Sequence, residues 1–406
     1  MRRGPERPIE HRLLLTATLC LLAAGAVMVY SASSARDLLS DRGDGTSFLV
    51  RYLLFGAIGF AVMQVLARRG LESVRRATPV LLFVSLVLLV AVLVPGLSEP
   101  INGARRWIGH GPVSFQPSEI AKLALILYAA ELLSSRRRIT TLRSVSPVVV
   151  VAAVMALLVA VEPDLGTALV IGGTTAAILV AAGMPLRHLA LLTGAALLLV
   201  ALFAMLEPYR RARLTAFLDP WADAGGTGFQ IVQGEIALGS GGLLGTGLGQ
   251  SVQKVFYLPE AHTDFILAVI GEEFGVAGIL IILALYGMIA YAGLRTARAA
   301  KGAYAKLLAS GLTSLILCQA ALNVFAVLGL APLTGVPLPF VSYGPSNLIV
   351  LLAAVGLILN IAAGGSAHLR EVRPRETRRA GRSAGKGRSA SPGRRVGRRR
   401  AGTGGS

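Results

Sequence analysis

The sequence predicts an all-α integral membrane protein with about ten transmembrane helices in one bundle. Of its 406 residues, 54% are hydrophobic and only 15% are charged. The mean hydropathy of +0.67 is too high for a soluble protein of this length. The chain also contains about ten apolar stretches close to the roughly 20 residues that a helix needs to cross a bilayer. Nearly all of residues 13–363 therefore belongs to the bundle.

The ten predicted spans are joined by short connections, except for one long connection after the seventh. The first span follows a basic segment, as a signal peptide would. Its apolar run is longer than a usual signal core, so we interpret it as an uncleaved span. The predicted spans are 13–30, 48–67, 78–94, 118–133, 145–161, 165–182, 188–206, 264–294, 302–330 and 346–362.

Basic residues predict the orientation of the bundle. If residues 1–12 are cytoplasmic, the even-numbered connections carry the arginines and lysines that the positive-inside rule expects on the cytoplasmic side. Both termini are then cytoplasmic, and residues 207–263 form a large extracytoplasmic loop. The basic residues that carry this prediction are Arg68, Arg69, Arg75, Arg76, Arg136, Arg137, Arg138, Arg143, Arg187, Arg295, Arg298 and Lys301.

The C-terminal segment 364–406 is dense in arginine, glycine and serine and contributes much of the formal net charge of +19. It has almost no hydrophobic residues, so it cannot bury a core, and we expect it to be disordered. A polybasic segment directly after a membrane span suits anionic lipid headgroups or an acidic cytoplasmic partner. We favour that interpretation over nucleic-acid binding.

Some arginines lie on the predicted outer side, against the topology rule. Arg105 and Arg106 follow the third span, and Arg210 follows the seventh. Fixed positive charge there suggests an anionic ligand, although ordinary loop solubility explains the same residues. Trp107 stands beside the arginine pair and suits either a sugar phosphate ligand or the membrane interface.

Polar residues also stand at the outer rims of the predicted spans. Glu119 and Lys122 are three residues apart and so share one helical face, as a structural ion pair or as a wall of a substrate cavity. Asp164 is placed to cap the sixth span, and a role in a site is the less favoured interpretation. His262 lies in the polar turn before the eighth span.

Asp264 opens the eighth predicted span and is the main candidate for chemistry. Its simplest role is to complement the helix N-terminus. A catalytic base needs the same placement, exposed to a cavity yet partly desolvated. Glu272 and Glu273 lie deeper in the span, and we expect them to be internal hydrogen-bond or ion-pair partners.

Two outward connections have unusual compositions. The long one contains a glycine-rich run at 239–250 without the lysine of a phosphate loop, so we expect irregular backbone that is buried in the protein or lines a wet cavity. The last one is rich in proline, cannot be helical and should be a rigid loop. Its Ser342 and Tyr343 could bind a ligand, but no histidine is placed to make Ser342 a nucleophile.

Seven motifs in order resemble the SEDS family of cell-wall polymerases, whose members serve shape, elongation, division and sporulation. They cover essentially the whole bundle and favour the division member FtsW over the elongation member RodA, with a sporulation paralogue left open. The motifs are NGARRWI, FQPSEIAKL, EPDLGTA, LDPW, GFQIVQGEIALGSGGLLGTGLGQ, YLPEAHTDFILAVIGEE and PLPFVSYG.

The resemblance implies a peptidoglycan glycosyltransferase that polymerises lipid II on the outer face of the cytoplasmic membrane, at the division septum. It implies a class B penicillin-binding protein as transpeptidase partner, together with other membrane proteins of the divisome. It also implies that Asp264 is essential for polymerisation. Family motif positions around the outward cavity fall on Arg106, Trp107, Glu119, Lys122 and Asp164.

The chain departs from the family in one place. The family usually reads SYGGSS, whereas this chain has Pro345 and Asn347 within SYGPSN. Because proline lacks a backbone donor and restricts φ, we expect a stiffer loop before the last span.

No cofactor is required by the sequence, although a divalent cation such as Mg²⁺ or Mn²⁺ could assist. Residue spacing indicates no cluster of metal ligands, and Cys20 and Cys318 lie far apart in apolar runs. Two other functions fit a polytopic bundle with buried charge. One is a lipid II flippase, and the other is a division scaffold that recruits a transpeptidase without catalysis.

Overall fold

The computed structural model describes residues 8–39, 45–98, 104–109, 114–136, 139, 141–206, 211, 215–255 and 257–364. Within these ranges the regular structure is helical apart from isolated β-bridges. Each of the ten predicted spans coincides with one long helix. The elements are α1 (Ile9–Leu39), α2 (Ser47–Arg68), α3 (Leu71–Val92), α4 (Pro117–Ser134), α5 (Leu142–Val161), α6 (Leu165–Ala181), α7 (Leu186–Leu206), η2 (Pro220–Asp223), α9 (Phe229–Gly241), α10 (Ile266–Ala299), α11 (Ala303–Val327) and α12 (Pro345–Ala362).

Among the described residues, seven helices are long and apolar enough to cross a membrane. Helix α6 and residues 186–202 of α7 are apolar but shorter. Helix α4 has a span's length but includes Glu119, Lys122 and Glu131. An all-helical, multi-pass membrane protein is therefore confirmed, while a count of ten spans stays a prediction.

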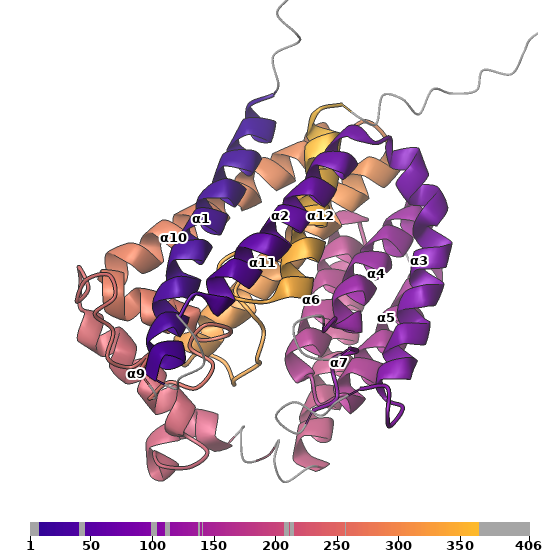
Figure 1. Cartoon of the computed structure of the whole chain (residues 1–406). Helices are drawn as coiled ribbons and strands as arrows, with labels where there is room; N and C mark the ends of the chain where they lie inside the picture. Colours follow the sequence, from indigo (N-terminus) through magenta and orange to yellow (C-terminus); the bar gives the residue numbers. More distant parts are fainter. Residues whose placement is uncertain are drawn as a thin grey trace, which may run out of the picture. The chain divides into compact units, whose positions relative to one another are not determined.

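Several helices extend beyond the apolar runs that predicted them. Helix α3 begins at Leu71 rather than near residue 78. Its polar first turns are stabilised by charge pairs, since Arg76 lies 3.4 Å from Glu72 on the same helix and Arg75 lies 3.4 Å from Glu131 on α4. Figure 1 shows α3, α4 and α5 side by side. Hydropathy locates the apolar centre of a helix, whereas its ends lie among charged side chains.

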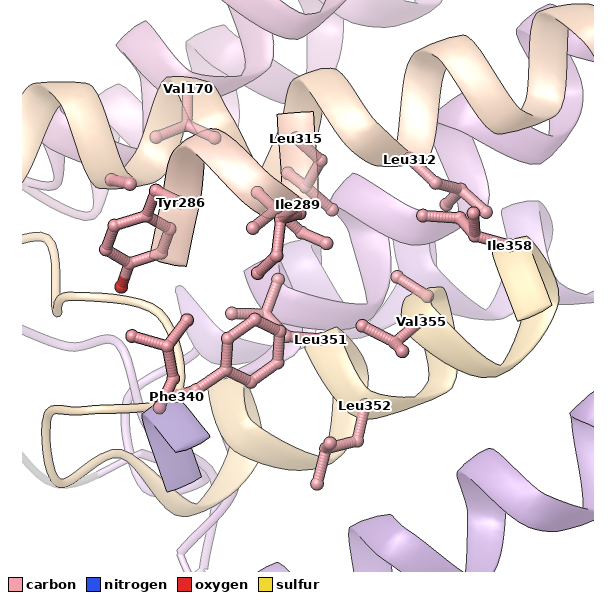
Figure 2. Packing of buried hydrophobic residues seen from close by; sticks show 14 of the residues in the cluster. Val170, Tyr286, Ile289, Leu312, Leu315, Phe340, Leu351, Leu352, Val355 and Ile358 are labelled. Atoms are coloured by element: carbon pink, nitrogen blue, oxygen red, sulfur yellow. The ribbon is translucent and has the colours of Figure 1, made fainter. Parts of the chain in front are cut away.

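Helix α12 is the most deeply buried span. Buried residues make up 83% of its apolar window, compared with 17% for α2 and α3. Figure 2 shows its Leu351 and Val355 beside Ile289 of α10, with Phe340 of the preceding loop at the same interface. The hydroxyl of Tyr286 on α10 donates to the Pro339 carbonyl at 2.5 Å. This packing anchors the proline-rich loop that precedes α12.

Two glycines let α2 and α12 approach closely. A Cβ built on Gly356 would lie 2.5 Å from the Met63 carbonyl oxygen, and one on Gly59 would lie 2.7 Å from the Leu352 side chain. Small residues at such contacts are typical of membrane helix pairs, which associate through close packing rather than through the hydrophobic effect.

Helix α10 is interrupted where the glycine-rich run meets it. Gly275 has φ 65 and ψ −162, which breaks the helical ladder. The run replaces the lost partners: the Thr246 and Gly247 amides donate to the carbonyls of Glu272 and Glu273 at 2.9 and 3.0 Å. In return, the amides of residues 276 and 277 donate to carbonyls of the run. The backbone of the run is irregular after α9 ends at Gly241, as expected, but residues 242–250 are mostly exposed rather than buried. The expectation that this backbone lines a wet cavity stays a prediction, and the break in the eighth predicted span was not anticipated.

A buried ion pair ties the same connection to the bundle. The Lys254 ammonium lies 2.7 Å from a Glu273 carboxylate oxygen, and both side chains are almost fully buried. Ser31 of α1 donates to the same oxygen at 2.6 Å and accepts from Lys254 at 3.0 Å. Glu272 accepts from Ser251 at 2.5 Å and from the Val252 amide at 2.9 Å. The expected internal role of both glutamates is therefore confirmed.

We predict that Lys254→Met lowers the free energy of unfolding by about 3 to 5 kcal/mol, because it leaves Glu273 as a buried, uncompensated charge. Thermal unfolding of the purified protein in detergent measures the change. The double variant Lys254→Met/Glu273→Met should recover most of the loss, since it removes both charges.

The matched control for this pair is Arg76→Met, which breaks the exposed pair with Glu72. An exposed pair of this kind contributes only about 0.3 to 0.5 kcal/mol. If Lys254→Met and Arg76→Met lower the free energy of unfolding equally, the buried pair does not hold the long connection to the bundle.

Candidate functional site

Asp264 lies in a turn immediately before α10, not within the helix. The helix begins at Ile266 with Phe265 at the N-cap, and Phe265 makes no side-chain capping hydrogen bond. Asp264 therefore directly precedes the N-cap residue, and its simplest expected role, to complement the helix N-terminus, stays a prediction. Its half-buried carboxylate accepts a hydrogen bond through Oδ1 from the Thr263 hydroxyl at 3.0 Å. The same hydroxyl lies 3.1 Å from a Glu260 carboxylate oxygen.

Arg106 reaches the space that Asp264 faces. Its Nε donates to the Glu162 carbonyl at 3.3 Å, and its Nη2 donates to the Pro163 carbonyl. A Cβ built on Gly335 would lie 3.9 Å from Arg106 Nη1 and 3.8 Å from Asp264 Oδ2. A carboxylate and a guanidinium, far apart in sequence, thus approach the same point above a glycine.

Gly335 belongs to the proline-rich loop at 331–344, which is not helical, as predicted; residues 338–342 of this loop are buried, whereas Gly335 is exposed. Its φ of +64 lies in the left-handed region, which favours glycine. Because glycine has no side chain, the space between Asp264 and Arg106 stays open. A larger residue would place its Cβ in van der Waals contact with both charged groups.

Asp164 caps α6, as expected. Its carboxylate accepts from the Thr167 amide at 3.0 Å and from the Thr167 hydroxyl at 2.9 Å. It also accepts from the Gln116 side chain at 3.2 Å, and the Gln116 amide donates to the Ser346 hydroxyl at 3.2 Å. Gln116 is the N-cap residue of α4, and Ser346 is in the first turn of α12. One glutamine therefore joins the N-termini of three helices.

Glu119 and Lys122 form a buried ion pair at 3.0 Å, and each side chain is 2% exposed. The ammonium also donates to Gln319 of α11 at 3.2 Å, and Asn347 of α12 donates to Glu119 at 2.8 Å. This is the arrangement of a structural ion pair that links α4, α11 and α12. The ion pair supports the site indirectly, because Gln319 also donates to the Pro337 carbonyl in the proline-rich loop at 3.1 Å.

The two departures from the family motif fit this network. Pro345 occupies the first turn of α12, where its missing N–H would be unpaired in any residue and its fixed φ suits the helix. The loop therefore loses no hydrogen bond to Pro345. Asn347 supplies a donor to the carboxylate of the buried ion pair.

His262, Tyr343 and Phe48 form an aromatic cluster beside the site. The His262 ring lies 4.5 Å from that of Phe48 and 5.8 Å from that of Tyr343. The Tyr343 amide donates to the His262 carbonyl at 2.9 Å, which joins the turn before α10 to the proline-rich loop. Burial raises the pKa of Tyr343, and Arg51 partly offsets the effect. Ser342 is buried and accepts from the Leu338 amide at 2.8 Å, so its hydroxyl stabilises the loop.

The remaining residues predicted for the site are Arg105, Trp107 and Arg210. Arg105 and Trp107 are half-buried in the same segment as Arg106. Arg210 lies outside the described residues, as does the basic tail. Among the residues that the structure does describe, no group of three His, Cys, Asp or Glu side chains could hold a metal ion.

Four helices begin at this site, namely α4, α6, α10 and α12. Their N-termini are joined by the Gln116 and Tyr343 contacts. Helix N-termini carry partial positive charge and bind anions readily. Together with the Arg106 guanidinium, they favour an anionic group in front of the Asp264 carboxylate.

Sequence reasoning missed Gly335, Gln319, Asn323 and Glu162 as parts of the site. Gln319 and Asn323 stand four residues apart in the apolar run of α11, so they share a helical face, which is a signal that could have identified them. The Asn323 amide donates to the carbonyls of Asp264 and Val336, both at 2.8 Å. Gly335 has no comparable sequence signal, because its role depends on what meets there in space.

Glu162 is a buried acid next to the site. It is 1% exposed, and neither of its carboxyl oxygens has a hydrogen-bond partner. Burial and the nearby Asp164 carboxylate raise its pKa from 4.5 to about 8, and the Arg106 guanidinium partly offsets this shift. Glu162 is therefore mainly protonated at neutral pH.

The helical membrane bundle and this site together point to one protein family. Residues 11–366 match the family of FtsW, RodA and SpoVE, which is described as cell cycle protein, and the chain belongs to it. The family resemblance drawn from the seven sequence motifs is thereby confirmed.

Named relatives cover almost the same length. The probable peptidoglycan glycosyltransferase FtsW of Trichlorobacter lovleyi is 41% identical over 365 residues, which are 89% of this chain and 96% of the relative. The stage V sporulation protein E of Bacillus subtilis is also 41% identical, over 86% of this chain and 96% of the relative. Identity alone therefore does not separate the division and sporulation branches.

Solved structures share the fold. One chain comes from a peptidoglycan synthase complex described for its structural coordination of polymerization and crosslinking. It matches with a TM-score of 0.71 and 30% identity over 86% of this chain and 96% of that chain. The rod shape determining protein RodA of Thermus thermophilus matches with a TM-score of 0.64 and 28% identity over 86% of this chain and 95% of that chain.

The raised pKa of Glu162 gives a pH-dependent contribution to stability. The folded protein binds this proton more tightly than the unfolded chain, whose glutamate has the usual pKa of 4.5. The stabilisation is therefore complete below that pH, declines as the pH rises, and is lost above a pH of about 8. We expect Glu162→Gln to match the wild type in Tm near pH 5 and to exceed it near pH 9.

The control is Asp223→Asn, an exposed acid whose pKa is lowered by hydrogen bonds from Thr227. Asp223 stays ionised throughout this pH range, so its effect on Tm should be constant. A pH-independent difference between Glu162→Gln and the wild type would contradict the protonated state of Glu162.

Proposed function

We propose that this protein is a peptidoglycan glycosyltransferase that polymerises lipid II on the outer face of the cytoplasmic membrane, with Asp264 as its catalytic base. The observation that carries the proposal is the approach of the Asp264 carboxylate and the Arg106 guanidinium to one point at Gly335. Family membership, and the peptidoglycan glycosyltransferase names of relatives at about 40% identity, support the reaction class.

The reaction assigns a distinct role to each charged group. The acceptor sugar hydroxyl attacks the anomeric carbon of the growing chain as Asp264 takes its proton. The new glycosidic C–O bond forms while the bond to the lipid pyrophosphate breaks. Arg106 and the helix N-termini stabilise the negative charge of the departing pyrophosphate. Lys122 is engaged with Glu119, so we assign it to support of the site rather than to the leaving group.

The carboxylates of this site could hold a divalent cation only together with phosphate oxygens of the substrate. Mg²⁺ is commonly bound by one or two carboxylates together with substrate phosphates. Asp264 and Glu260 both lie about 3 Å from the Thr263 hydroxyl, so these two carboxylates are the ones that would hold such an ion together with the substrate phosphates. The cation would neutralise pyrophosphate charge alongside Arg106.

The cellular setting follows from the predicted topology. We propose ten spans, with both termini cytoplasmic and the Asp264 site on the outer side, where lipid II is used. A structural relative belongs to a complex that couples polymerization to crosslinking. We therefore propose a class B penicillin-binding protein as transpeptidase partner and septal wall synthesis as the process.

The first test is glycan-strand formation from purified lipid II by the full-length protein with its transpeptidase. Asp264→Asn is nearly isosteric, and we expect the rate to fall about 10²- to 10⁴-fold, the usual contribution of a general base. Lipid II binding, measured separately, should be retained.

Asp223→Asn serves as the matched control, because it makes the same change in the long connection before α10, at an exposed acid. It should keep wild-type activity. If neither the wild type nor the control polymerises lipid II, yet the wild type moves it across a vesicle membrane, the protein is a flippase instead. If the chain is needed to recruit the transpeptidase but shows neither polymerase nor flippase activity, the scaffold function is favoured.

Chelation tests the cation. We expect EDTA to reduce polymerisation at least about tenfold and Mg²⁺ or Mn²⁺ to restore it, since the cation would share the charge of the leaving group. Full activity in EDTA would instead mean that Arg106 and the helix N-termini suffice. A parallel measurement of Tm with and without EDTA separates an effect on catalysis from an effect on folding.

A further inference from the structure

Asn323 is the side chain that connects the two backbone segments of the site. It is on α11 and only 1% exposed. Its Nδ2 donates to the Asp264 carbonyl and to the Val336 carbonyl, each at 2.8 Å. Both partners are acceptors, so the orientation of the amide is determined by its neighbours.

These two carbonyls belong to two different segments of the proposed site. Asp264 carries the carboxylate, and Val336 follows Gly335, the residue that both charged groups approach. One side-chain amide therefore joins the backbone of Asp264 directly to the loop residue that follows Gly335.

Asp264 needs such a contact because it is not part of a helix. The first helical residue of α10 is Ile266, so helical geometry does not determine the Asp264 backbone conformation. Other contacts act in the same region: Thr263 bonds the carboxylate, Tyr343 bonds the neighbouring His262 carbonyl, and the Phe265 amide bonds the Glu260 carbonyl. Asn323 reaches from helix α11 to the Asp264 backbone itself.

The other half of the amide is unused. Asn323 Oδ1 is buried and has no hydrogen-bond partner. Buried polar atoms are nearly always paired, so an orphan of this kind calls for an explanation. Asparagine at this position is explained by its two donors rather than by its acceptor.

We propose that Asn323 is the positioning residue of Asp264, which it holds at the correct distance from Gly335 and Arg106. The inference rests on the proposed polymerase function. Asn323 does not touch the reacting atoms but acts through the Asp264 backbone. Loss of its donors should therefore lower kcat, because the base is misplaced, and should leave KM for lipid II nearly unchanged.

The structure offers a matched control in Asn360 on α12. It is also buried, and its Nδ2 donates to backbone carbonyls at the end of α2, those of Leu66 at 2.9 Å, Ala67 at 3.2 Å and Arg69. Its Oδ1 is likewise unpartnered. Asn323 and Asn360 thus share their local chemistry and differ in which backbone they hold.

The experiment compares Asn323→Leu and Asn360→Leu in the full-length protein with its transpeptidase. Kinetics of glycan-strand formation give kcat and KM, and thermal unfolding in detergent gives Tm. We expect both variants to lose Tm. Only Asn323→Leu should lose kcat, by about 10²-fold, as a misplacement of about 1 Å produces.

Asn323→Ser covers the case in which the leucine variant does not fold. Its hydroxyl can donate one hydrogen bond, so an intermediate kcat is expected. The proposal is overturned if Asn323→Ser keeps wild-type kcat, if KM rises while kcat is unchanged, or if both leucine variants lose kcat in proportion to Tm. An inactive wild type would instead overturn the polymerase function itself.

Discussion

Hydrogen-bonding groups inside a bilayer must find their partners within the protein, and the architecture of this chain depends on that constraint. Water is absent from the hydrocarbon core, so each unpaired backbone group costs several kcal/mol. Helix α10 breaks at Gly275, and the glycine-rich run supplies the missing donors and acceptors through residues such as Thr246 and Gly247. The long connection is therefore an integral part of the bundle.

The same constraint determines where charge is tolerated. Glu119 with Lys122, and Glu273 with Lys254, are buried as pairs with further hydrogen bonds. Asp264 differs in burial, because it is half-buried and approaches Arg106 at Gly335. Buried pairs can stabilise the fold, whereas a half-buried carboxylate is the kind of group that the proposed proton transfer requires.

The site is built from segments that are far apart in sequence. The loop at 331–344 is its centre, because Arg106, Asp264 and Asn323 all meet it from different elements. Burial of α12 and the Tyr286 contact to Pro339 make this loop rigid. A rigid loop lets a side chain such as Asn323 hold the proposed catalytic carboxylate within the small range of positions that proton transfer requires.

Hydropathy and motif order were enough to predict the all-helical membrane fold and the family, because these depend on local composition and on residue identity. The same motifs single out Asp264, whose catalytic role stays a prediction. The capping role of Asp164 was also predictable, since a cap acts within three residues of its own helix. The break at Gly275, the part played by Gly335 and the backbone partners of Asn323 were not predictable. Each depends on which distant segment packs against it, and only the tertiary structure decides that.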